Sequence, residues 1–433
     1  MRLAWFSPLP PVRSGVAAYS ADLLTRLDRH HTIDRFADAS TGRQDGYDAH
    51  DFVWRQRREP YDLVVYQLGN APCHDYMWAY LTTYPGLAVL HDARLHHARA
   101  RSLLNRNRFD DYRAEFRFDH PDAPPDATEY AVEGLGGPIY YLWSMLRVVM
   151  TTARLIAVHN ARVADDLRQA YPSAAIETIR MGVPDQPARP GEAARLRREW
   201  NVPDSGVIFT AFGKITAEKR IGAILRAFQK LVSEGIDAYL LLAGDADGYP
   251  LFGRETSGMD RIRVTGHVDE GRIGACLAAS DACLCLRWPT AQETSASWLR
   301  CLAAGRPTVI SALAHLADIP VADPRSARPA RQWREPVAIA IDLLDEDASL
   351  LLAMRRLAAD PALRANLGRA GRDHWARWHT LDLMEEDYQR VIRDAAARPA
   401  PSPSDMPAHL ADNHSEHARR IVLRFGSHLG MLE

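Results

Sequence analysis

Short apolar runs alternate with amphipathic helical patterns along most of the 433 residues, and this alternation restarts near the middle of the chain. Several runs are apolar throughout, as in strands that are covered on both faces of a parallel sheet. The expected strands are 2–6, 61–67, 86–91, 154–159 and 175–180 in the first half, and 207–212, 239–243, 262–265, 282–286, 308–310 and 337–341 in the second. Alternating strands and helices predict parallel sheets with right-handed crossovers. We therefore predict an α/β fold with two doubly wound, Rossmann-like parallel-sheet domains.

A segment rich in Pro and Gly, residues 182–206, separates the two halves and is typical of an interdomain linker. We predict an N-terminal domain over residues 1–183 and a C-terminal domain over residues 184–373. Residues 374–395 have the apolar spacing of a single helix. From 396 to 433 the composition shifts to Ala, Pro and Ser, which predicts a flexible Pro/Ala-rich tail.

Composition argues against several classes of protein. The formal net charge of −2 disfavours a general nucleic-acid binder. The longest apolar stretch, near residues 139–150, is interrupted by Arg147 and is shorter than the ~20 residues of a membrane-spanning helix. The N-terminus lacks the basic and apolar regions of a signal peptide. The five cysteines have no C-x-x-C spacing, so we expect buried, reduced thiols in a cytoplasmic protein, and neither a disulfide framework nor a zinc site.

The chain has three lysines against 50 arginines, and two of the three, Lys214 and Lys219, stand five residues apart after an expected strand. That strand ends at Gly213, so the two ammonium groups flank a loop and the first turn of the next helix. Ligands of open α/β sheets bind beyond the carboxyl ends of the strands. Two cations at that place can neutralise a diphosphate, helped by the helix dipole. The alternative is a pair of surface lysines without function, which the scarcity of lysine disfavours.

A second stretch combines one carboxylate, Glu293, with small residues that open a helix. These small residues are Thr294, Ser295, Ala296 and Ser297. Small side chains at a helix start leave the backbone N–H groups open to phosphate oxygens. The carboxylate of Glu293 would meet a sugar hydroxyl, because it would repel a phosphate. The alternative is an ordinary helix cap, which contributes about 1 kcal/mol to stability and has no further function.

Together, these two stretches resemble the donor-binding half of glycosyltransferase family 4, whose members are retaining enzymes with the GT-B fold. Members of that family carry a basic pair after a strand glycine and a Glu-x7-Glu pattern in a loop and helix. The loop with Gly266, His267 and Val268 resembles the family's loop beside the nucleotide base. The Pro-rich stretch 8–19, which contains Gly15, resembles its glycine loop over the donor diphosphate.

The first half carries further resemblances. Gln67 and Asn70 match one motif around the family's acceptor and catalytic cleft, and His91 with Asp92 matches another. The helix at 374–395 resembles the one that crosses back to the N-terminal domain. The resemblance spans roughly residues 1–393, and its motifs are specific jointly, although each alone is loose.

The resemblance implies two domains that face a central cleft, the N-terminal one on the acceptor side and the C-terminal one binding a nucleotide-sugar. It implies hexosyl transfer with retention, without an obligatory metal or other cofactor. Lys214 and Lys219 would stabilise the departing diphosphate, aided by Gly15 and by the backbone amides of 294–297. Glu293 would orient the sugar, and His91 would hold the sugar or the nucleophile.

Two positions depart from the family pattern. Cys301 stands where the second glutamate would bind the nucleotide ribose, which puts that contact and the nucleotide preference in doubt. Lys214 stands where the family more often has Arg, so the charge is kept and the bidentate fork is lost.

The sequence leaves the partners and two other functions open. The expected partners are a nucleotide-sugar and an unidentified glycan, lipid-linked or small-molecule acceptor in polysaccharide or glycoconjugate biosynthesis, and no nucleic acid. The arginine-rich segment 94–117 could contact lipid head groups at the inner face of the membrane, but we favour an ordinary solvated face. The other functions are a nucleotide-sugar epimerase on the same scaffold and a catalytically weak, GT-B-like binding subunit, which Cys301 favours.

Overall fold

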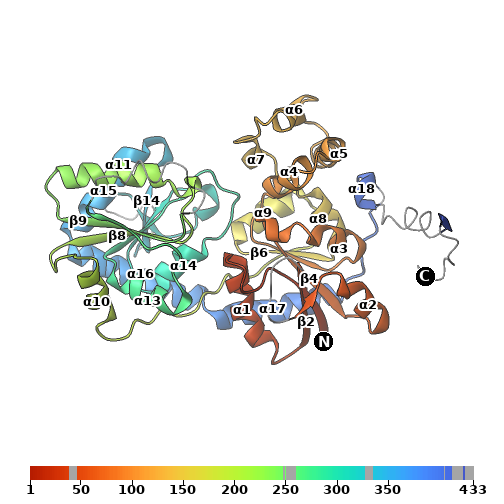
Figure 1. Cartoon of the computed structure of the whole chain (residues 1–433), viewed down its shortest axis with the longest axis horizontal. Coiled ribbons are helices and arrows are strands. Elements are labelled where there is room, and N and C mark those ends of the chain that lie inside the picture. The colour runs from red at the N-terminus through yellow and green to blue at the C-terminus, as the bar shows by residue number, and fades with distance from the viewer. Residues whose placement is uncertain are drawn as a thin grey trace. The chain divides into compact units, whose positions relative to one another are not determined.

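The computed structural model describes residues 1–38, 46–246, 249, 260–326, 335–403, 405–411 and 423–424. The chain divides into two compact units. The first comprises Met1–Ile179, Ala291–Glu293 and Glu385–Glu433, and the second comprises Arg180–Thr290 and Thr294–Met384. Each unit contains one sheet with helices on both faces (Figure 1).

The sheet of the first unit has seven parallel strands in the order β3-β2-β1-β4-β5-β6-β7. The strands are β1 (Arg2–Phe6), β2 (Thr32–Ala37), β3 (Tyr47–Asp48), β4 (Leu63–Leu68), β5 (Leu87–Leu90), β6 (Leu155–Val158) and β7 (Ile176–Thr178). The strand order reverses between β1 and β4. In doubly wound folds, ligands bind at such a switch point, beyond the carboxyl ends of the strands.

The helices of the first unit pack on its sheet and on one another. They are α1 (Gly15–Leu27), α2 (Asp51–Arg58), α3 (Met77–Thr83), α4 (His96–Leu104), α5 (Phe109–Asp119), α6 (Ala127–Val132), α7 (Ile139–Leu142), α8 (Arg147–Thr152), α9 (Ala161–Ala170), most of α17 (Leu381–Ala396) and α18 (Ala408–Ala411). One core cluster is formed by α2, α3, α8 and α9, while α1 and α17 lie on the opposite face (Figure 1). Helices α4 to α8 all belong to the connection between β5 and β6.

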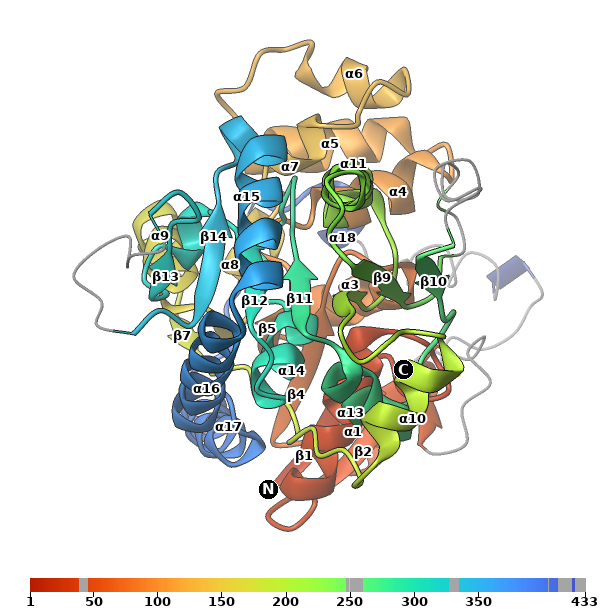
Figure 2. The same ribbon diagram turned by 90° about the vertical axis from the view of Figure 1, so that its left-hand side faces the viewer.

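The sheet of the second unit repeats this plan in the order β10-β9-β8-β11-β12-β14-β13, again with parallel strands. The strands are β8 (Val207–Phe212), β9 (Ala238–Ala243), β10 (Ile262–Val264), β11 (Ala282–Cys285), β12 (Thr308–Ser311), β13 (Val321–Ala322) and β14 (Ala338–Ile341). The helices are α10 (Glu192–Glu199), α11 (Ile221–Ser233), α13 (Glu270–Ala279), α14 (Ala296–Ala303), α15 (Glu346–Ala359) and α16 (Pro361–Trp378). Helices α11 and α15 cover one face, and α13, α14 and α16 cover the other (Figure 2).

The predicted α/β class with two doubly wound parallel sheets is confirmed. Each of the eleven predicted strands overlaps an observed one, and β1 and β8 have the predicted ends. The sequence does not predict β2, β3 and β13. Strand β2 carries Asp34 and Arg35 near the edge of its sheet, and the other two are edge strands of two residues each, so they lack the continuous apolar run of a buried strand.

The single helix predicted over 374–395 is wrong, because the structure has two helices there. Helix α16 ends at Trp378 and α17 begins at Leu381. The backbone N–H of Leu383 donates to the Thr380 Oγ1 at 3.3 Å, so this hydroxyl caps the new helix. The Nδ1 of His379 lies 3.0 Å from the carbonyl oxygen of Met181, which holds the break in place.

Part of the predicted flexible tail packs against the first unit. Met406 and Leu410 contact its core, and the Nε2 of His409 lies 2.7 Å from the Oε1 of Glu115. Residues 404, 412–422 and 425–433 of that tail lie outside the described residues. Among the described helices, none has the length and apolar character required to cross a membrane.

Candidate active site

Strand β8 ends at Phe212, and the chain turns at Gly213 with φ of +94°. The Gly213 N–H donates to the carbonyl oxygen of Ala243 at 2.9 Å, which holds the turn against the end of β9. A Cβ at position 213 would lie 2.6 Å from the Nζ of Lys219 and 2.6 Å from the Oγ of Ser297. Both the backbone conformation and the lack of space therefore require glycine. These distances also show that three predicted site residues, Gly213, Lys219 and Ser297, converge.

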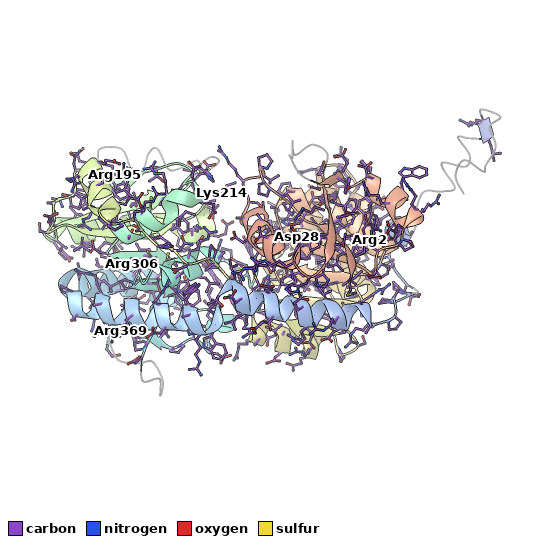
Figure 3. All side chains as sticks on the ribbon, turned by 90° about the horizontal axis from the view of Figure 1, so that it is seen from below. Arg2, Asp28, Arg195, Lys214, Arg306 and Arg369 are labelled. Carbon is purple, nitrogen blue, oxygen red and sulfur yellow. The ribbon has the colours of Figure 1, made fainter. Side chains whose placement is uncertain are left out.

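The two lysines of this loop differ in environment. The Nζ of Lys219 donates a hydrogen bond to the Phe212 carbonyl oxygen at 2.7 Å. Burial first, and then the charge of the nearby Arg287, lower the pKa of Lys219 to about 7. No carboxylate pairs with Lys219 among the residues that the structure describes. Lys214, in contrast, is exposed on the surface of the second unit (Figure 3).

The two serines at the start of α14, Ser295 and Ser297, have different structural roles. The Oγ of Ser295 accepts a hydrogen bond from the Trp298 N–H at 3.2 Å, so Ser295 is the helix cap that the sequence allowed as the alternative. The Nε1 of Trp298 donates to the Thr308 Oγ1 at 3.0 Å and ties the helix to β12. Ser297, the second residue of the helix, is the residue that faces Gly213. The first helical residue, Ala296, is partly exposed.

Two hydroxyl groups in these loops are buried and have no hydrogen-bond partner among the described residues. They are the Oγ1 of Thr216 and the Oγ1 of Thr294. An unpaired buried polar group costs about 1–3 kcal/mol, so such groups call for a partner that water or a ligand can supply. Sequence reasoning included Thr294 and missed Thr216. Its place between the two lysines is the signal that could have found it.

Cys301, which stands where a second glutamate was expected, is a core residue. Its side chain is fully buried on α14, and its Sγ lies 3.9 Å from the Sγ of Cys285. Hydrogen bonding with Cys283 and Cys285, and then burial, raise the pKa of the Cys301 thiol. The thiol is therefore neutral and occupied by core contacts. All five cysteines of the chain are free, as expected, although Cys73 and Cys285 are only partly buried.

Glu293 is half-buried and belongs, with Ala291 and Gln292, to the first unit. The Ala93 N–H donates to the Ala291 carbonyl oxygen at 2.9 Å. Ala93 follows the predicted pair His91 and Asp92 directly. The Glu293 loop is therefore anchored beside the loop that carries the predicted histidine, a contact that the sequence does not indicate.

The predicted nucleotide-side loop follows β10. Gly266 has φ of +67°, and the Thr265 N–H donates to the Leu242 carbonyl oxygen at 3.1 Å. His267 is exposed, with its Nε2 3.9 Å from a carboxylate oxygen of Asp269. Val268 packs against the hydrophobic core beneath Phe212. This loop lies at the same carboxyl edge of the sheet as Gly213, with β9 between their strands.

In the first unit, buried polar side chains gather at the carboxyl ends of β4, β5 and β6. The Nε2 of His91 lies 2.7 Å from the Oε1 of Gln67, and the Gln67 amide donates to the Tyr388 hydroxyl at 3.2 Å. Tyr19 donates to the same hydroxyl at 2.8 Å. The ring of His159, after β6, lies 5.0 Å from that of His91 between centroids. The sequence indicated Gln67 and His91, but Tyr19, Tyr388 and His159 come from distant segments.

This network sets the proton positions on His91. Burial, and then the charges of His159 and His74, lower the pKa of His91 well below its ordinary value, so the ring is neutral at physiological pH. Because the Gln67 amide N–H faces Tyr388, its carbonyl oxygen faces His91, and the Nε2 of His91 must donate. The remaining ring nitrogen, Nδ1, is then an acceptor suited to a hydroxyl.

Of three other predicted site residues, Asn70 and Asp92 make hydrogen bonds within the first unit, and the space beside the Gly15 Cα is open. The Asn70 side chain donates to the Arg94 carbonyl oxygen at 2.7 Å and accepts from the Ala98 N–H at 3.1 Å. The carboxylate of Asp92 accepts the Asn70 N–H at 2.7 Å. These two residues shape the loop before α4. Gly15 begins α1, and a Cβ there would meet no atom within 4 Å.

The arginine-rich segment 94–117 is largely paired within the protein. The Arg99 Nε donates to Glu115 at 2.7 Å in a buried ion pair, Arg101 contacts Asp75 at 2.7 Å, and Arg113 contacts Glu129 at 2.7 Å. Carboxylates within the first unit therefore hold these three arginines, and the Arg99–Glu115 pair is buried. Across the described parts of both units, no three His, Cys, Asp or Glu side chains are grouped in a way that could hold a metal ion.

Residues 206–327 match the family model for "Glycosyl transferases group 1". This range contains the whole Gly213–Lys219 loop and the start of α14. That match spans less than a third of the chain. The chain has the GT-B fold. The Anabaena protein HepE, solved with UDP-glucose, superposes with a TM-score of 0.63 and 11% identity over 91% of this chain and 99% of that one.

The chain is also similar to two further proteins. Sucrose-phosphate synthase from Thermosynechococcus elongatus superposes with a TM-score of 0.62 and 14% identity, over 91% of this chain and 98% of that one. A GDP-mannose-dependent alpha-(1-6)-phosphatidylinositol dimannoside mannosyltransferase of Mycobacterium tuberculosis is 30% identical over 149 residues. That match spans 34% of this chain and 38% of the mycobacterial protein, so it covers well under half of either.

Proposed function

We propose that this GT-B chain is a retaining hexosyltransferase that moves a sugar from a nucleoside-diphosphate donor to an acceptor hydroxyl without an obligatory metal. The proposal rests chiefly on the loop after β8. There the half-buried Lys219 ammonium lies against Gly213 and Ser297 and has no carboxylate partner among the described residues. A desolvated cation of this kind is stabilised by an incoming anion, and a diphosphate supplies two charges.

The chemical roles follow from these environments. When the bond between the anomeric carbon and the diphosphate breaks, charge develops on the departing oxygen. A buried ammonium stabilises that charge more strongly than a solvated one, because little water screens it. The unpaired hydroxyls of Thr216 and Thr294 would donate to the same phosphate oxygens. Lys214, which is exposed, would contribute mainly by attracting the donor.

In the first unit, the neutral His91 would accept a hydrogen bond from a sugar hydroxyl at its Nδ1 and hold that sugar in place. Glu293 would orient the donor sugar through another hydroxyl. The acceptor oxygen would attack on the face from which the diphosphate leaves, and its proton would pass to the departing diphosphate oxygen. No side chain is assigned as a covalent nucleophile.

The relatives support a nucleotide-sugar donor without deciding which one. The mycobacterial relative is named as GDP-mannose-dependent, whereas HepE was solved with UDP-glucose. The mycobacterial name also includes phosphatidylinositol dimannoside, a glycolipid, which supports a lipid-linked acceptor and peripheral contact with a membrane. A thermal-shift panel of UDP-, GDP-, ADP- and TDP-sugars would identify the donor, because a ligand stabilises the fold by RT ln(1 + [L]/Kd).

A catalytically weak binding subunit is the second candidate, since the Cys301 thiol is occupied by core contacts where the family has a carboxylate. Donor hydrolysis or transfer that disappears in Glu293→Ala would count against it. An epimerase would convert the donor with no acceptor present, so product analysis separates that activity from transfer.

Calorimetry with the donor found by the panel tests the site itself. Lys219→Ala should weaken binding by about tenfold or more, whereas Lys230→Ala should bind like the parent. Lys230 is the matched control because it is exposed on α11 and pairs with Glu234 at 3.8 Å. Equal binding by the parent and Lys219→Ala would refute the assignment of Lys219 to the diphosphate.

A further inference from the structure

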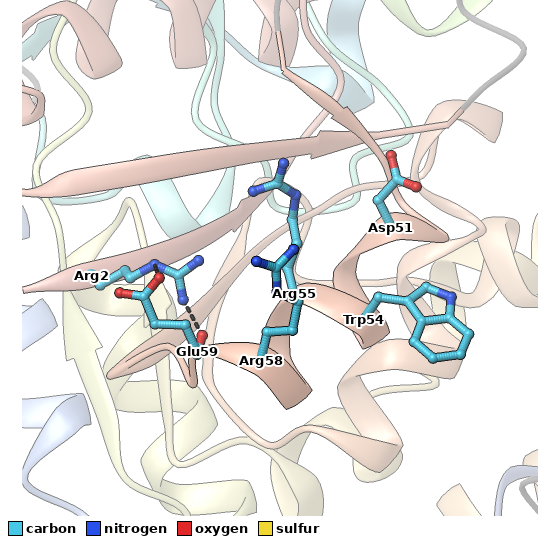
Figure 4. Close-up of a pocket in the computed structure, with 6 residues that line it drawn as sticks. All are labelled: Arg2, Asp51, Trp54, Arg55, Arg58 and Glu59. Atoms are coloured by element: carbon cyan, nitrogen blue, oxygen red, sulfur yellow. Dashed lines mark hydrogen bonds and ion pairs between the residues drawn. The ribbon is translucent and has the colours of Figure 1, made fainter. Parts of the chain in front are cut away.

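The first unit has a pocket that is separate from the candidate-site residues of that unit, such as Gln67 and His91. It has a volume of about 620 Å³ and is lined by Arg2, Asp51, Trp54, Arg55, Arg58 and Glu59 (Figure 4). Four of these residues belong to α2, and Arg2 begins β1. Gln67 and His91 lie at the opposite, carboxyl ends of their strands. The volume is in the range of about 300–1,000 Å³ that is typical of small-ligand sites.

The inner side of α2 is fixed by packing, and its outer side is free to bind. Phe52 is fully buried and stacks on Tyr61 with ring centroids 5.7 Å apart. Trp54, in contrast, is 66% exposed. An indole ring has a large apolar face, and leaving it in water forgoes the free energy of burial. An exposed tryptophan at the rim of a pocket is therefore well suited to stack on a flat ligand ring.

Two of the three pocket arginines are already held by acidic and aromatic side chains. Arg2 and Arg55 both contact the Asp34 carboxylate, at 3.1 Å and 3.5 Å. Their guanidinium groups also lie over aromatic rings, Arg2 over Tyr61 at 3.8 Å and Arg55 over Tyr47 at 3.2 Å. These contacts hold the two side chains in place, as the floor of a binding site requires.

Arg58 differs from the other two, because no ion pair holds it within the part of the chain that the structure describes. It lies four residues after Trp54, one turn along the same helical face, where side chains are about 5–6 Å apart at Cβ. A guanidinium in this position can take one carboxylate or phosphate group in a bidentate pair.

The two carboxylates of the pocket, Asp51 and Glu59, restrict the ligand further. They would repel a second negative charge but accept hydrogen bonds from hydroxyl groups. A suitable ligand therefore has a ring, several hydroxyls and a single acidic group. We propose that this pocket binds an anionic carbohydrate, whose ring stacks on Trp54 and whose phosphate or carboxylate pairs with Arg58.

The test uses the full-length protein with the tryptophans labelled for NMR and follows the indole N–H signal that is lost in Trp54→Phe. Glucose 6-phosphate and glucuronate are the anionic probes, and glucose and inorganic phosphate are the comparison probes. At least one anionic sugar should shift the Trp54 signal saturably, and Arg58→Gln should weaken that binding by about tenfold or more. Comparing the two anionic probes shows whether the phosphate or the carboxylate is preferred.

Arg57→Gln is the matched control, because Arg57 is exposed on the same helix and does not line the pocket. It should bind like the parent. Trp54 and Arg58 are exposed, so Trp54→Phe and Arg58→Gln should both fold. Unchanged melting temperatures would verify this. The proposal is overturned if no anionic sugar shifts the Trp54 signal, if Arg58→Gln binds as well as Arg57→Gln, or if inorganic phosphate binds as tightly as the sugars. A response that is lost in Lys219→Ala would also overturn it, because it would then arise at the donor site.

Discussion

The Nζ of Lys219 donates a 2.7 Å hydrogen bond to the backbone carbonyl oxygen of Phe212, the last residue of β8. This contact fixes the ammonium at the carboxyl end of the strand, next to Gly213 and Ser297. A carbonyl oxygen carries only a partial negative charge, so it does not compensate for the loss of water. The pKa of Lys219 is therefore lowered to about 7, and both the binding of an anion and the stability of the fold should depend on it.

We expect the affinity for a nucleotide-sugar to fall as the pH rises above about 7. The protonated lysine binds the diphosphate, so above the pKa the protein must take up a proton on binding, which costs about tenfold in affinity per pH unit. Calorimetry between about pH 6 and pH 9 measures this slope. Lys219→Arg keeps a charge that does not titrate in this range, so its profile should be flatter, and an equally flat profile in the parent would contradict the expectation.

Lys219→Met should raise the free energy of unfolding by about 1–2 kcal/mol below pH 7, because it replaces a desolvated cation by an apolar side chain. Between the lowered folded pKa of about 7 and the ordinary pKa of lysine, only the unfolded state holds the proton. The parent therefore gains stability as the pH rises through this window, and the advantage of Lys219→Met should shrink there. Urea unfolding at two pH values measures both effects, and Lys230→Met, at an exposed lysine, should change stability little.

Gly213→Ala should destabilise the second unit by about 2–4 kcal/mol and abolish donor binding. The positive φ alone costs roughly 1 kcal/mol, and the added Cβ would clash with the Lys219 ammonium and the Ser297 hydroxyl. Gly191→Ala is a matched control, since Gly191 has φ of +77° and open space around it. It should show the cost of the backbone conformation only. Normal donor binding by Gly213→Ala would argue against a tight fit at this turn.

Tyr388→Phe should lower the free energy of unfolding by about 1–3 kcal/mol, because the Tyr19 hydroxyl and the Gln67 amide both lose their buried acceptor. It should also lower transfer activity, because Gln67 orients His91. Tyr130→Phe, at a side chain that is 50% exposed, is the control and should leave both quantities unchanged. Chemical denaturation and a donor-hydrolysis assay measure the two effects, and wild-type values for both in Tyr388→Phe would show that the network is dispensable.

Local sequence patterns predicted the elements that carry continuous apolar runs and missed those that do not. Strands β1 and β8 are buried over nearly their whole length, so their apolar runs end where the strands end. Strand β2 alternates polar and apolar residues near a sheet edge, and its pattern is ambiguous. The break at Thr380 was missed because a threonine cap inside an apolar helical pattern changes that pattern very little.

The candidate site was predictable where its residues stand at the end of a strand or the start of a helix. Gly213, Lys219 and Ser297 were selected from a strand end and a helix start, and the topology of a parallel sheet brings such ends together. Thr216 was missed although it stands between the two lysines, because sequence does not show that its hydroxyl is buried without a partner among the described residues. The sequence assigns the same diphosphate-binding role to Lys214 and Lys219. It does not show that Lys214 is exposed and Lys219 is desolvated.

The sequence by itself determined the fold class, the position of the cationic loop and the scarcity of lysine that drew attention to it, since these depend on local periodicity and residue identity. Only the tertiary structure decided which lysine is desolvated, that the Cys301 thiol is occupied by other thiols, and that Tyr19, Gln67, Tyr388 and His91 form one network. The physical reason is that desolvation and hydrogen bonding depend on neighbours that lie up to hundreds of residues away, and these neighbours are set by how the sheets and helices pack.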